Sequence, residues 1–317
     1  MRCRVCRDRA AIEVRRHNAA FCADHFLAHC REQVARAIKK HWMFGPEAHV
    51  LVAVSGGKDS LMLWDVLAGL GYTTTGVYLG LGIGAYSDES REACERFASG
   101  RGLDLEVVDL AAEYGYDIPT GAAAARRATC ATCGLSKRYI LNDFAIKGDF
   151  DVLATGHNLD DEAAVLFGNL VHWNVEALGR QKPVLPAAAG FVSRVKPLVR
   201  LGERETAAYA VMRGIDYIVD ECPMVAGNTG LRYKETLNEM ERTSPGTKHQ
   251  LYFGFLEHGL ARFEPQDPEE APDVHACSRC GAPTTADVCA FCRLREQATD
   301  PDRVAVALTR GPRRRRG

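Results

Sequence analysis

The sequence has no long hydrophobic run and almost no net charge, and each absence excludes a class of protein. No apolar stretch of the 317 residues approaches the roughly 20 residues that a membrane-spanning helix needs. The N-terminus lacks the charged and then apolar pattern of a secretory signal peptide, so we expect a cytoplasmic protein that makes no contact with a membrane. The formal net charge of −1 gives no overall attraction to nucleic acid, and any such partner needs a local basic patch.

Cysteine, by contrast, is abundant. Twelve cysteines are many for a reducing compartment, where disulfides are disfavoured. Most of them lie in clusters with the spacing of metal ligands, whereas Cys30 and Cys94 stand apart. Cys94 falls at a helical position that is typical of a core thiol. The clusters therefore indicate bound metal rather than disulfide bonds.

One stretch, residues 50–60, organises the rest of the chain. Residues 50–54 are apolar and mostly β-branched, which predicts a buried parallel strand. The turn Ser-Gly-Gly-Lys-Asp-Ser follows at 55–60, and apolar residues with helical spacing begin at Leu61. Such a turn directs backbone N–H groups and the positive end of a helix dipole at one point, which suits a phosphate. It lacks Walker A spacing and resembles the S-G-G-x-D-S loop of the PP-loop ATP pyrophosphatases; a tight turn that merely uses glycine is the alternative.

Two cysteine clusters have the spacing of structural zinc sites. The N-terminal cluster pairs Cys3-x-x-Cys6 with Cys22-x-x-His25, which supplies four tetrahedral ligands. His17 and His29 are rival ligands, but His25 has the spacing, and unliganded thiols in a small core are the alternative. The second cluster predicts a zinc ribbon, and its ligands are Cys277, Cys280, Cys289 and Cys292.

The remaining pair, Cys130-x-x-Cys133, has no second pair close behind it, so a zinc site is less natural there. A redox pair is possible chemistry for this spacing. A third interpretation is an iron–sulfur cluster that a distant cysteine completes, and Cys222 in Glu-Cys-Pro has the most suggestive setting. Lys137 lies four residues beyond Cys133 and shares its face if a helix begins there, so it is either a cation for phosphate or a surface lysine.

Further strands are expected at 74–79, 105–110 and 150–156, with helices at 88–100 and 163–170. Residues 119–125 are small and predict a loose segment. Ligands of doubly wound sheets bind beyond the carboxyl ends of the strands. Leu79 is therefore a candidate for backbone contact with adenine, and Gly156 would let the backbone approach the nucleotide.

Charged residues follow the later strands. Asp160, Asp161 and Glu162 can cap the helix that they precede, and Asp161 is our candidate for Mg²⁺ or substrate because it should face the same crevice as residues 55–60. Basic residues that could hold phosphates of ATP or RNA are Arg194, Lys196, Arg200, Arg232 and Lys234.

The length suits one large α/β domain with accessory modules. The expected organisation is a zinc finger at 1–30, a connecting helix at 31–48, a catalytic domain at 49–263, a linker at 264–276 and a zinc ribbon with a basic tail at 277–317. The tail ends in an arginine run that could attract phosphate backbones or simply be a soluble tail.

Taken together, these motifs resemble the TtuA-type tRNA 2-thiouridine synthetases of the TtcA/Ncs6 group. The resemblance covers nearly the whole chain, including the S-G-G-K-D-S loop, C-x-x-C-G-L-S-K-R-Y and T-G-H-N-L-D-D-E-A-A. It implies a doubly wound, mainly parallel α/β sheet of the adenine nucleotide alpha hydrolase type, flanked by the two zinc modules. It implies a [4Fe–4S] cluster on Cys130, Cys133 and Cys222, and catalytic roles for Lys137 and Asp161. The implied ATP contacts are Ala53, Ser55, Gly56, Gly57, Lys58, Asp59, Ser60, Leu79, Lys137, Gly156 and Asp161.

The same resemblance implies an activity and partners. The enzyme would adenylylate the C2 oxygen of a tRNA uridine, best the ribothymidine of the T-loop, with ATP and Mg²⁺, and replace that oxygen with sulfur held by the cluster. Its sulfur donor would be a ubiquitin-like protein thiocarboxylate or sulfide, and it would form a homodimer. The residues leave open thiolation of an anticodon-loop cytidine or wobble uridine, a small-molecule PP-loop ligase, and a zinc-finger nucleic-acid binder without catalysis.

Overall fold

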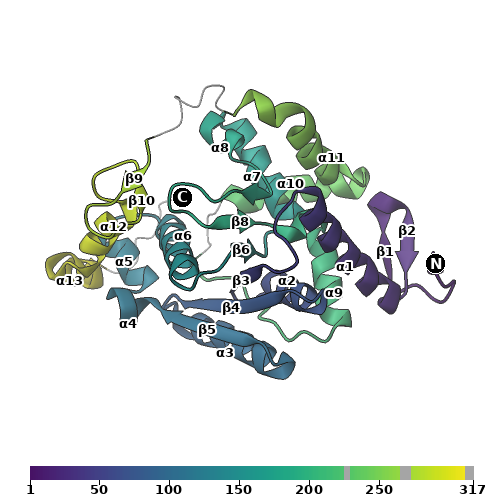
Figure 1. Cartoon of the computed structure of the whole chain (residues 1–317), viewed down its shortest axis with the longest axis horizontal. Coiled ribbons are helices and arrows are strands. Elements are labelled where there is room, and N and C mark those ends of the chain that lie inside the picture. Colours follow the sequence, from purple (N-terminus) through teal and green to yellow (C-terminus); the bar gives the residue numbers. More distant parts are fainter. Residues whose placement is uncertain (225–228, 265–272, 311–317) are drawn as a thin grey trace.

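The apolar run at residues 50–54 forms the centre of a six-stranded sheet. The structure, a computed structural model, describes residues 1–224, 229–264 and 273–310. In order across the sheet, the strands are β5 (Asp104–Asp109), β4 (Thr73–Gly80), β3 (His49–Val54), β6 (Val152–Thr155), β8 (Ser193–Val195) and β7 (Val184–Leu185). Every neighbouring pair is parallel except β7 with β8. Figure 1 shows helices on both faces, so the expected doubly wound, mainly parallel sheet is confirmed.

The other elements surround this sheet. The helices of the central part are α1 (Ala23–Lys40), α2 (Lys58–Gly69), α3 (Gly84–Arg101), α4 (Leu110–Tyr114), α5 (Ile118–Ala124), α6 (Thr129–Lys147), α7 (Leu159–Val171), α8 (Val175–Gly179), α9 (Glu203–Met212), α10 (Thr229–Thr243) and α11 (Thr247–Gly254). Short helical turns are η1 (Arg15–His17), η2 (Pro197–Arg200), η3 (Phe255–Gly259) and η4 (Leu260–Arg262). The terminal modules contain β1 (Ile12–Val14), β2 (Ala19–Phe21), β9 (His275–Ala276), β10 (Pro283–Thr284), α12 (Ala290–Thr299) and α13 (Pro301–Arg310). No described helix combines the length and hydrophobicity of a membrane crossing.

Strand β3 is apolar on both faces because both faces are covered. Val50, Val52 and Val54 pack in a core with residues of α1, α2 and α9. Leu51 points the other way and packs in a second core with residues of α6. This two-sided burial explains why the strand has a continuous apolar run rather than an alternating pattern.

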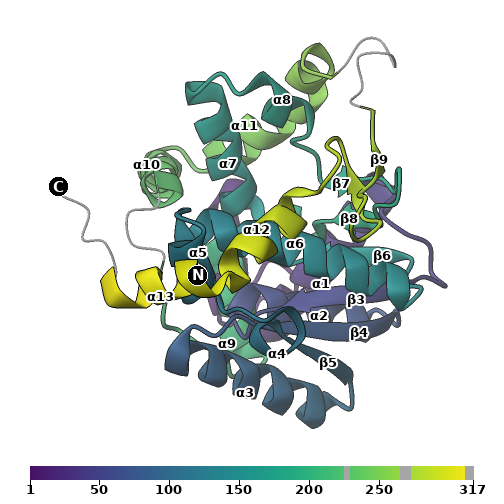
Figure 2. The ribbon, with the colours of Figure 1, turned by 90° about the vertical axis from the view of Figure 1, so that its left-hand side faces the viewer.

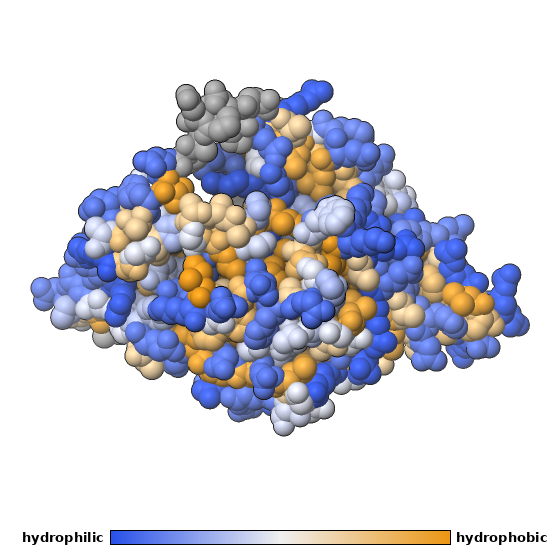
Figure 3. All heavy atoms as spheres, in the orientation of Figure 1, coloured by the Kyte–Doolittle hydropathy of each residue, from blue (hydrophilic) through white to orange (hydrophobic). Residues whose placement is uncertain are grey.

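The two small modules extend these two cores. Ile12, Val14 and Phe21 of the N-terminal hairpin belong to the first core, and Cys277, Phe291 and other residues of the C-terminal module belong to the second. Figure 1 places the modules at opposite ends of the molecule, and Figure 2 shows α12 lying beside α5 and α6. Figure 3 shows hydrophobic side chains near the middle of one face and hydrophilic ones around its periphery.

Several details differ from expectation. The segment at 119–125, expected to be loose, is helix α5, because Asp117 caps it by accepting a hydrogen bond from Thr120 N (2.7 Å) and Pro119 occupies its first turn. Its small residues let α12 and α13 pack against it. Cys94 is a buried core thiol as expected, and Cys30 is buried too. Residues 265–272 of the expected linker and the arginine run at 311–317 lie outside the described residues.

A buried carboxylate ties three helices together. Asp65 of α2 accepts hydrogen bonds from Arg101 Nε of α3 (2.7 Å), and from the Tyr209 hydroxyl (2.7 Å) and Arg213 Nε (3.0 Å) at α9. Burial alone would raise the pKa of Asp65, but these donors hold it below its usual value. Helix α2, which begins within the turn at residues 55–60, is therefore fixed to its neighbours by charge as well as by packing.

We expect Asp65→Asn to lower the free energy of unfolding by about 3 kcal/mol, because it leaves two guanidinium groups facing a neutral amide. Urea unfolding followed by circular dichroism measures the change. Glu95→Gln, which removes an exposed ion pair with Arg91 on α3, is the matched control and should change stability by less than about 0.5 kcal/mol. Equal effects of the two substitutions would contradict a structural role for the buried carboxylate.

Candidate nucleotide and metal sites

A cavity of about 510 Å³ lies at the carboxyl ends of β3, β4 and β6. Seven of the expected ATP contacts line it: Ala53, Ser55, Asp59, Ser60, Leu79, Lys137 and Gly156. Its wall also includes apolar residues such as Val77, Leu81 and Leu141. A polar edge beside an apolar wall suits a nucleotide, whose phosphates and base have opposite preferences.

The turn between β3 and α2 is held by its own hydroxyl groups. Ser60 Oγ donates to the Gly57 carbonyl (3.0 Å) and accepts from Ser55 N (3.1 Å). Gly56 has φ +75°, and a Cβ atom there would lie 2.7 Å from the Ser90 carbonyl oxygen of α3. The turn therefore needs glycine for its conformation and for its close contact with α3. It presents the N-terminus of a 12-residue helix to the cavity.

Gly156 makes a backbone contact that only glycine allows. A Cβ atom at this position would lie 2.8 Å from Ser60 N and 2.9 Å from Ser60 Cα. The glycine thus lets the residue after β6 touch the backbone at the start of α2, and it also lines the cavity. The approach of a nucleotide to this backbone stays a prediction.

Lys58 lies outside the cavity wall and joins a chain of charges. Its Nζ pairs with Asp59 Oδ2 and with Glu203 Oε1, both at 3.0 Å. Glu203, the first residue of α9, also pairs with Lys234 Nζ at 2.8 Å. Burial would raise the pKa of Glu203, but hydrogen bonds from Lys234 and Lys58 outweigh it and lower the pKa to about 2. The carboxylate is therefore ionised at neutral pH and holds both lysines.

Asp161 does not line the cavity, in contrast to our expectation. Its Oδ2 accepts from Asn158 N (3.1 Å) in a capping box at the start of α7, and its Oδ1 pairs with Lys234 Nζ (2.9 Å). Through Lys234 and Glu203 it is connected to Lys58 and so to the turn. Lys234, which we expected on a basic surface, is thus committed to two carboxylates.

The neighbouring carboxylates also differ from the expected capping role. Asp160 accepts from Glu203 N (3.0 Å) and pairs with Lys248, and Glu162 pairs with Lys196 Nζ (2.7 Å). The helix cap is supplied instead by Asn158, which accepts from the N–H groups of both aspartates. Long-range partners have taken these side chains away from the helix end.

Four basic side chains line the cavity. They are Lys137, Arg138, Arg194 and Lys196. Burial lowers the pKa of Arg194, and the nearby Arg138 adds to this effect. Arg200, expected beside them, instead donates to Gln33 Oε1 of α1 (3.0 Å) and lies over the Phe253 ring. The remaining cations match the charge of a nucleotide or RNA phosphate.

The third cysteine cluster lies at the edge of this cavity. Helix α6 begins at Thr129, before the pair, so Cys130, Cys133 and Lys137 all lie on its first turns. Burial raises the pKa of Cys133, Lys137 opposes the shift, and Cys222 and Cys130 add to it. Cys130 Sγ lies 3.6 Å from the Met224 carbonyl oxygen, two residues beyond Cys222, so the cysteine pair of α6 lies beside the segment that carries Cys222.

These three thiols are not gathered around one point as zinc ligands would be, and among the described residues only the terminal clusters are. Cys130, Cys133 and Cys222 therefore do not form a closed four-ligand zinc site in this structure. Cys130 is exposed, and Cys133 and Cys222 are half-buried.

Both terminal clusters bring four ligand atoms within 4.8 Å of one another: Cys3, Cys6, Cys22 and His25, and Cys277, Cys280, Cys289 and Cys292. In the first, His25 Nδ1 is the facing atom and lies 3.1 Å from Cys22 Sγ. His17 and His29 are not part of it. The donor set and its closed geometry fit tetrahedral Zn²⁺ in each case.

Backbone amides prepare the first cysteine of each cluster as a thiolate. Burial opposes the effect, but N–H groups that include those of Cys6 and Val5 lower the pKa of Cys3 to about 6. In the same way, N–H groups that include those of Cys289 (3.2 Å) and Arg279 lower the pKa of Cys277 to about 6. A thiolate is the form that binds metal.

Comparison with known proteins gives concordant matches along the chain. Residues 27–234 match the PP-loop domain, and residues 2–27 match the N-terminal LIM domain of 2-thiouridine synthetase TtuA. The chain is similar to a tRNA-5-methyluridine(54) 2-sulfurtransferase of Thermus thermophilus, with 50% identity over 93% of this chain and 91% of the relative. An enzyme of the same name from Pyrococcus horikoshii is 41% identical over 93% of each chain. The U34-tRNA thiolase NcsA from Methanococcus maripaludis, solved with its [4Fe-4S] cluster, shares the fold at a TM-score of 0.77 and 23% identity, over 93% of this chain and 95% of that one.

The contact at Gly156 generates a prediction about nucleotide affinity. We expect Gly156→Ala to raise the dissociation constant of ATP by at least about tenfold, or about 1.4 kcal/mol, because the added methyl group displaces the Ser60 backbone. Isothermal titration calorimetry with ATP and Mg²⁺ measures it. Gly69→Ala, near the end of α2 with open space around its Cβ position, is the control and should bind ATP as the parent protein does. Unchanged affinity in Gly156→Ala would contradict this placement of the phosphate site.

Proposed function

The chain belongs to the family of tRNA-5-methyluridine(54) 2-sulfurtransferases built on a PP-loop domain, and we propose that it uses ATP to replace the C2 oxygen of 5-methyluridine 54 of tRNA with sulfur. One observation carries this proposal beyond family membership. The β3–α2 turn and Lys137 line a single cavity together with Gly134, the residue that follows Cys133. Activation of an oxygen and delivery of sulfur to the same carbon need such proximity.

The chemistry explains why both halves of the site are needed. The C2 carbonyl of uracil is a poor electrophile because oxide is a poor leaving group. Attack of the C2 oxygen on the α-phosphorus of ATP breaks the bond to the β-phosphate and releases pyrophosphate. Attack of sulfide on C2 then breaks the C2–O bond and releases AMP, which carries the original oxygen. The sum consumes tRNA, ATP and sulfide and yields thiolated tRNA, AMP and pyrophosphate.

The residues of the cavity suit these steps. The N–H groups of the β3–α2 turn, with Ser55 and Ser60, would bind the phosphates that leave as pyrophosphate. Lys137 would stabilise charge at the α-phosphate, since it lines the cavity between the turn and the cysteines. Asp59 lines the cavity and would bind Mg²⁺, which would neutralise pyrophosphate. Asp161, outside the cavity wall, would join it by exchanging Lys234 for the cation. The apolar wall near Leu79 would take the adenine ring.

Three cysteines would hold the sulfur that the reaction delivers. A [4Fe–4S] cluster held by Cys130, Cys133 and Cys222 would supply one open iron position for the sulfide. Lys137, four residues after Cys133 on α6, would then face both ATP and the sulfur. The stack of Tyr139 of α6 on Phe291 of the C-terminal module, with 3.8 Å between ring centroids, would keep this helix in place.

The proposal includes a sulfur donor, an assembly and a location. A ubiquitin-like protein thiocarboxylate would supply the sulfur, with free sulfide able to replace it in vitro, and two copies of the chain would form the active enzyme. The twelve free cysteines support a reducing compartment, the cytoplasm. The cations at the cavity mouth support phosphate contacts with tRNA. We expect recognition of the T-loop by shape and stacking rather than by duplex readout.

The test is nucleoside mass spectrometry of tRNA that carries 5-methyluridine 54. After anaerobic incubation with cluster-loaded protein, ATP–Mg²⁺ and sulfide, we expect 2-thio-5-methyluridine, and Cys222→Ala should abolish it while both zinc ions remain. Cys94→Ser, which replaces a buried thiol outside the clusters and keeps an acceptor for the Gly56 N–H, is the control and should keep activity. Thiolated cytidine or wobble uridine would redirect the proposal to another base. ATP cleaved to AMP without any thionucleoside would favour a small-molecule PP-loop ligase instead.

A further inference from the structure

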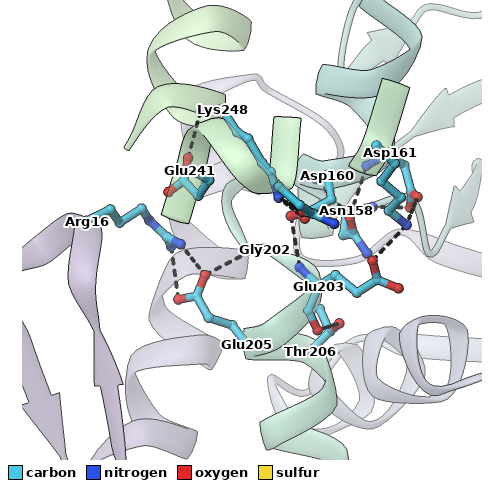
Figure 4. Close-up of polar contacts among 12 residues, drawn as sticks. Arg16, Asn158, Asp160, Asp161, Gly202, Glu203, Glu205, Thr206, Glu241 and Lys248 are labelled. Atoms are coloured by element: carbon cyan, nitrogen blue, oxygen red, sulfur yellow. Dashed lines mark hydrogen bonds and ion pairs between the residues drawn. The ribbon is translucent and has the colours of Figure 1, made fainter. Parts of the chain in front are cut away.

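The first turn of α9 connects parts of the molecule that are far apart in sequence. Figure 4 shows Glu205 in polar contact with Arg16 and with Gly202, and Glu203 in polar contact with Asp160. A cavity of about 370 Å³ borders this turn and is lined by residues of the N-terminal hairpin, α9 and α10. Apolar packing therefore does not fix the turn on that side, and its polar contacts must hold it.

One of these contacts comes from the N-terminal module. Arg16 of η1 forms a two-pronged ion pair with Glu205, and its Nη2 lies 3.0 Å from Glu205 Oε1. Only 10% of the Arg16 side chain and 6% of the Glu205 side chain are exposed, so water screens the pair weakly. Glu205 Oε2 accepts from Gly202 N (2.9 Å) in the capping box of α9. Arg16 Nη2 also donates to the Arg200 carbonyl (3.0 Å), just before the helix.

The opposite side of the first turn of α9 contacts the β3–α2 turn, which is the proposed phosphate-binding loop. Glu203 pairs with Lys58 Nζ at 3.0 Å, and the Thr206 hydroxyl donates to Asp59 Oδ1. Lys58 and Asp59 are the last two residues before Ser60 in the loop sequence. Any displacement of the turn would therefore move the two side chains that orient Lys58 and Asp59.

We propose that Arg16 is a positioning residue of the ATP site, through which the N-terminal zinc module sets the affinity for ATP. It acts by fixing Glu205 and thereby the first turn of α9, which carries Glu203 and Thr206. This inference rests on the proposed function only in taking the β3–α2 turn as the ATP site. It gives the zinc module a role in catalysis that does not require the module to touch tRNA.

The planar fork of arginine is central to the inference. Two parallel N–H donors match one carboxylate, and a third contact reaches the Arg200 carbonyl. A lysine could keep the charge but not all of these bonds. The nearest alternative partner for Glu205 is His29, whose Nε2 lies 3.9 Å from Oε1, too far for a hydrogen bond.

The experiment compares ATP binding and kinetics in three variants. Arg16→Ala should raise the dissociation constant and KM for ATP by about tenfold or more, with little change in the KM for tRNA and with full zinc and iron content. Arg16→Lys should be affected less, by about threefold, which also provides a folded variant if Arg16→Ala is unstable. Arg15→Ala is the matched control. The exposed Arg15 lies on the same turn, and its guanidinium donates to the Arg242 carbonyl of α10 (3.2 Å).

A double-mutant cycle separates positioning from general destabilisation. Because Arg16 acts through both Glu203 and Thr206, its substitution in a background that carries Glu203→Gln and Thr206→Val should add less than about twofold to the ATP dissociation constant. Additive effects, or unchanged ATP affinity in folded Arg16→Ala and Arg16→Lys, would overturn the inference. Parent protein that binds no ATP would instead refute the proposed function, so the two failures are distinguishable.

Discussion

Close backbone contact between the β3–α2 turn and the segments beside it is the constraint on which the site depends. Gly156 allows the end of β6 to touch Ser60, and Gly56 allows the turn after β3 to touch α3. With a side chain at either position the turn would shift, and the amides that face the cavity would lose their common direction. The apolar run of β3, buried on both faces, supplies the rigid base from which this turn starts.

Charge then fixes the outer side of the turn. Lys58, Glu203, Lys234 and Asp161 alternate in sign along one connected chain. Each lysine is shared by two carboxylates, so the net charge of the network stays small until ATP and a cation arrive. Such a network costs little conformational freedom per contact, since each side chain is already held by another partner. It also explains why Lys58 and Asp161 are near the cavity but do not line it.

The features that depend on residues close together in the chain could be predicted from the sequence. The β3–α2 turn, the parallel sheet and the four-ligand sets of both terminal clusters follow from periodicity and ligand intervals, and the family matches confirm the TtuA-type resemblance. Helix α5 is hard to predict because its small residues carry no amphipathic pattern, and Asp117 at its N-cap is the available signal. Glu203 and Thr206 could not be predicted because their partners in the β3–α2 turn, Lys58 and Asp59, lie more than 140 residues away in the chain. Arg16 could not be predicted because Glu205 lies 189 residues away. For Glu203, the Gly-Glu-Arg-Glu start of α9 was the available clue.

The account's central claim is that ATP activates the C2 oxygen of the target uridine. Its most direct test uses tRNA that carries ¹⁸O at C2 of 5-methyluridine 54, with cluster-loaded protein, ATP–Mg²⁺ and sulfide under anaerobic conditions. Mass spectrometry of the AMP should find one ¹⁸O atom for each thionucleoside formed, because the C2–O bond breaks after the oxygen has joined phosphorus. AMP without the label, alongside normal thiolation, would contradict the claim.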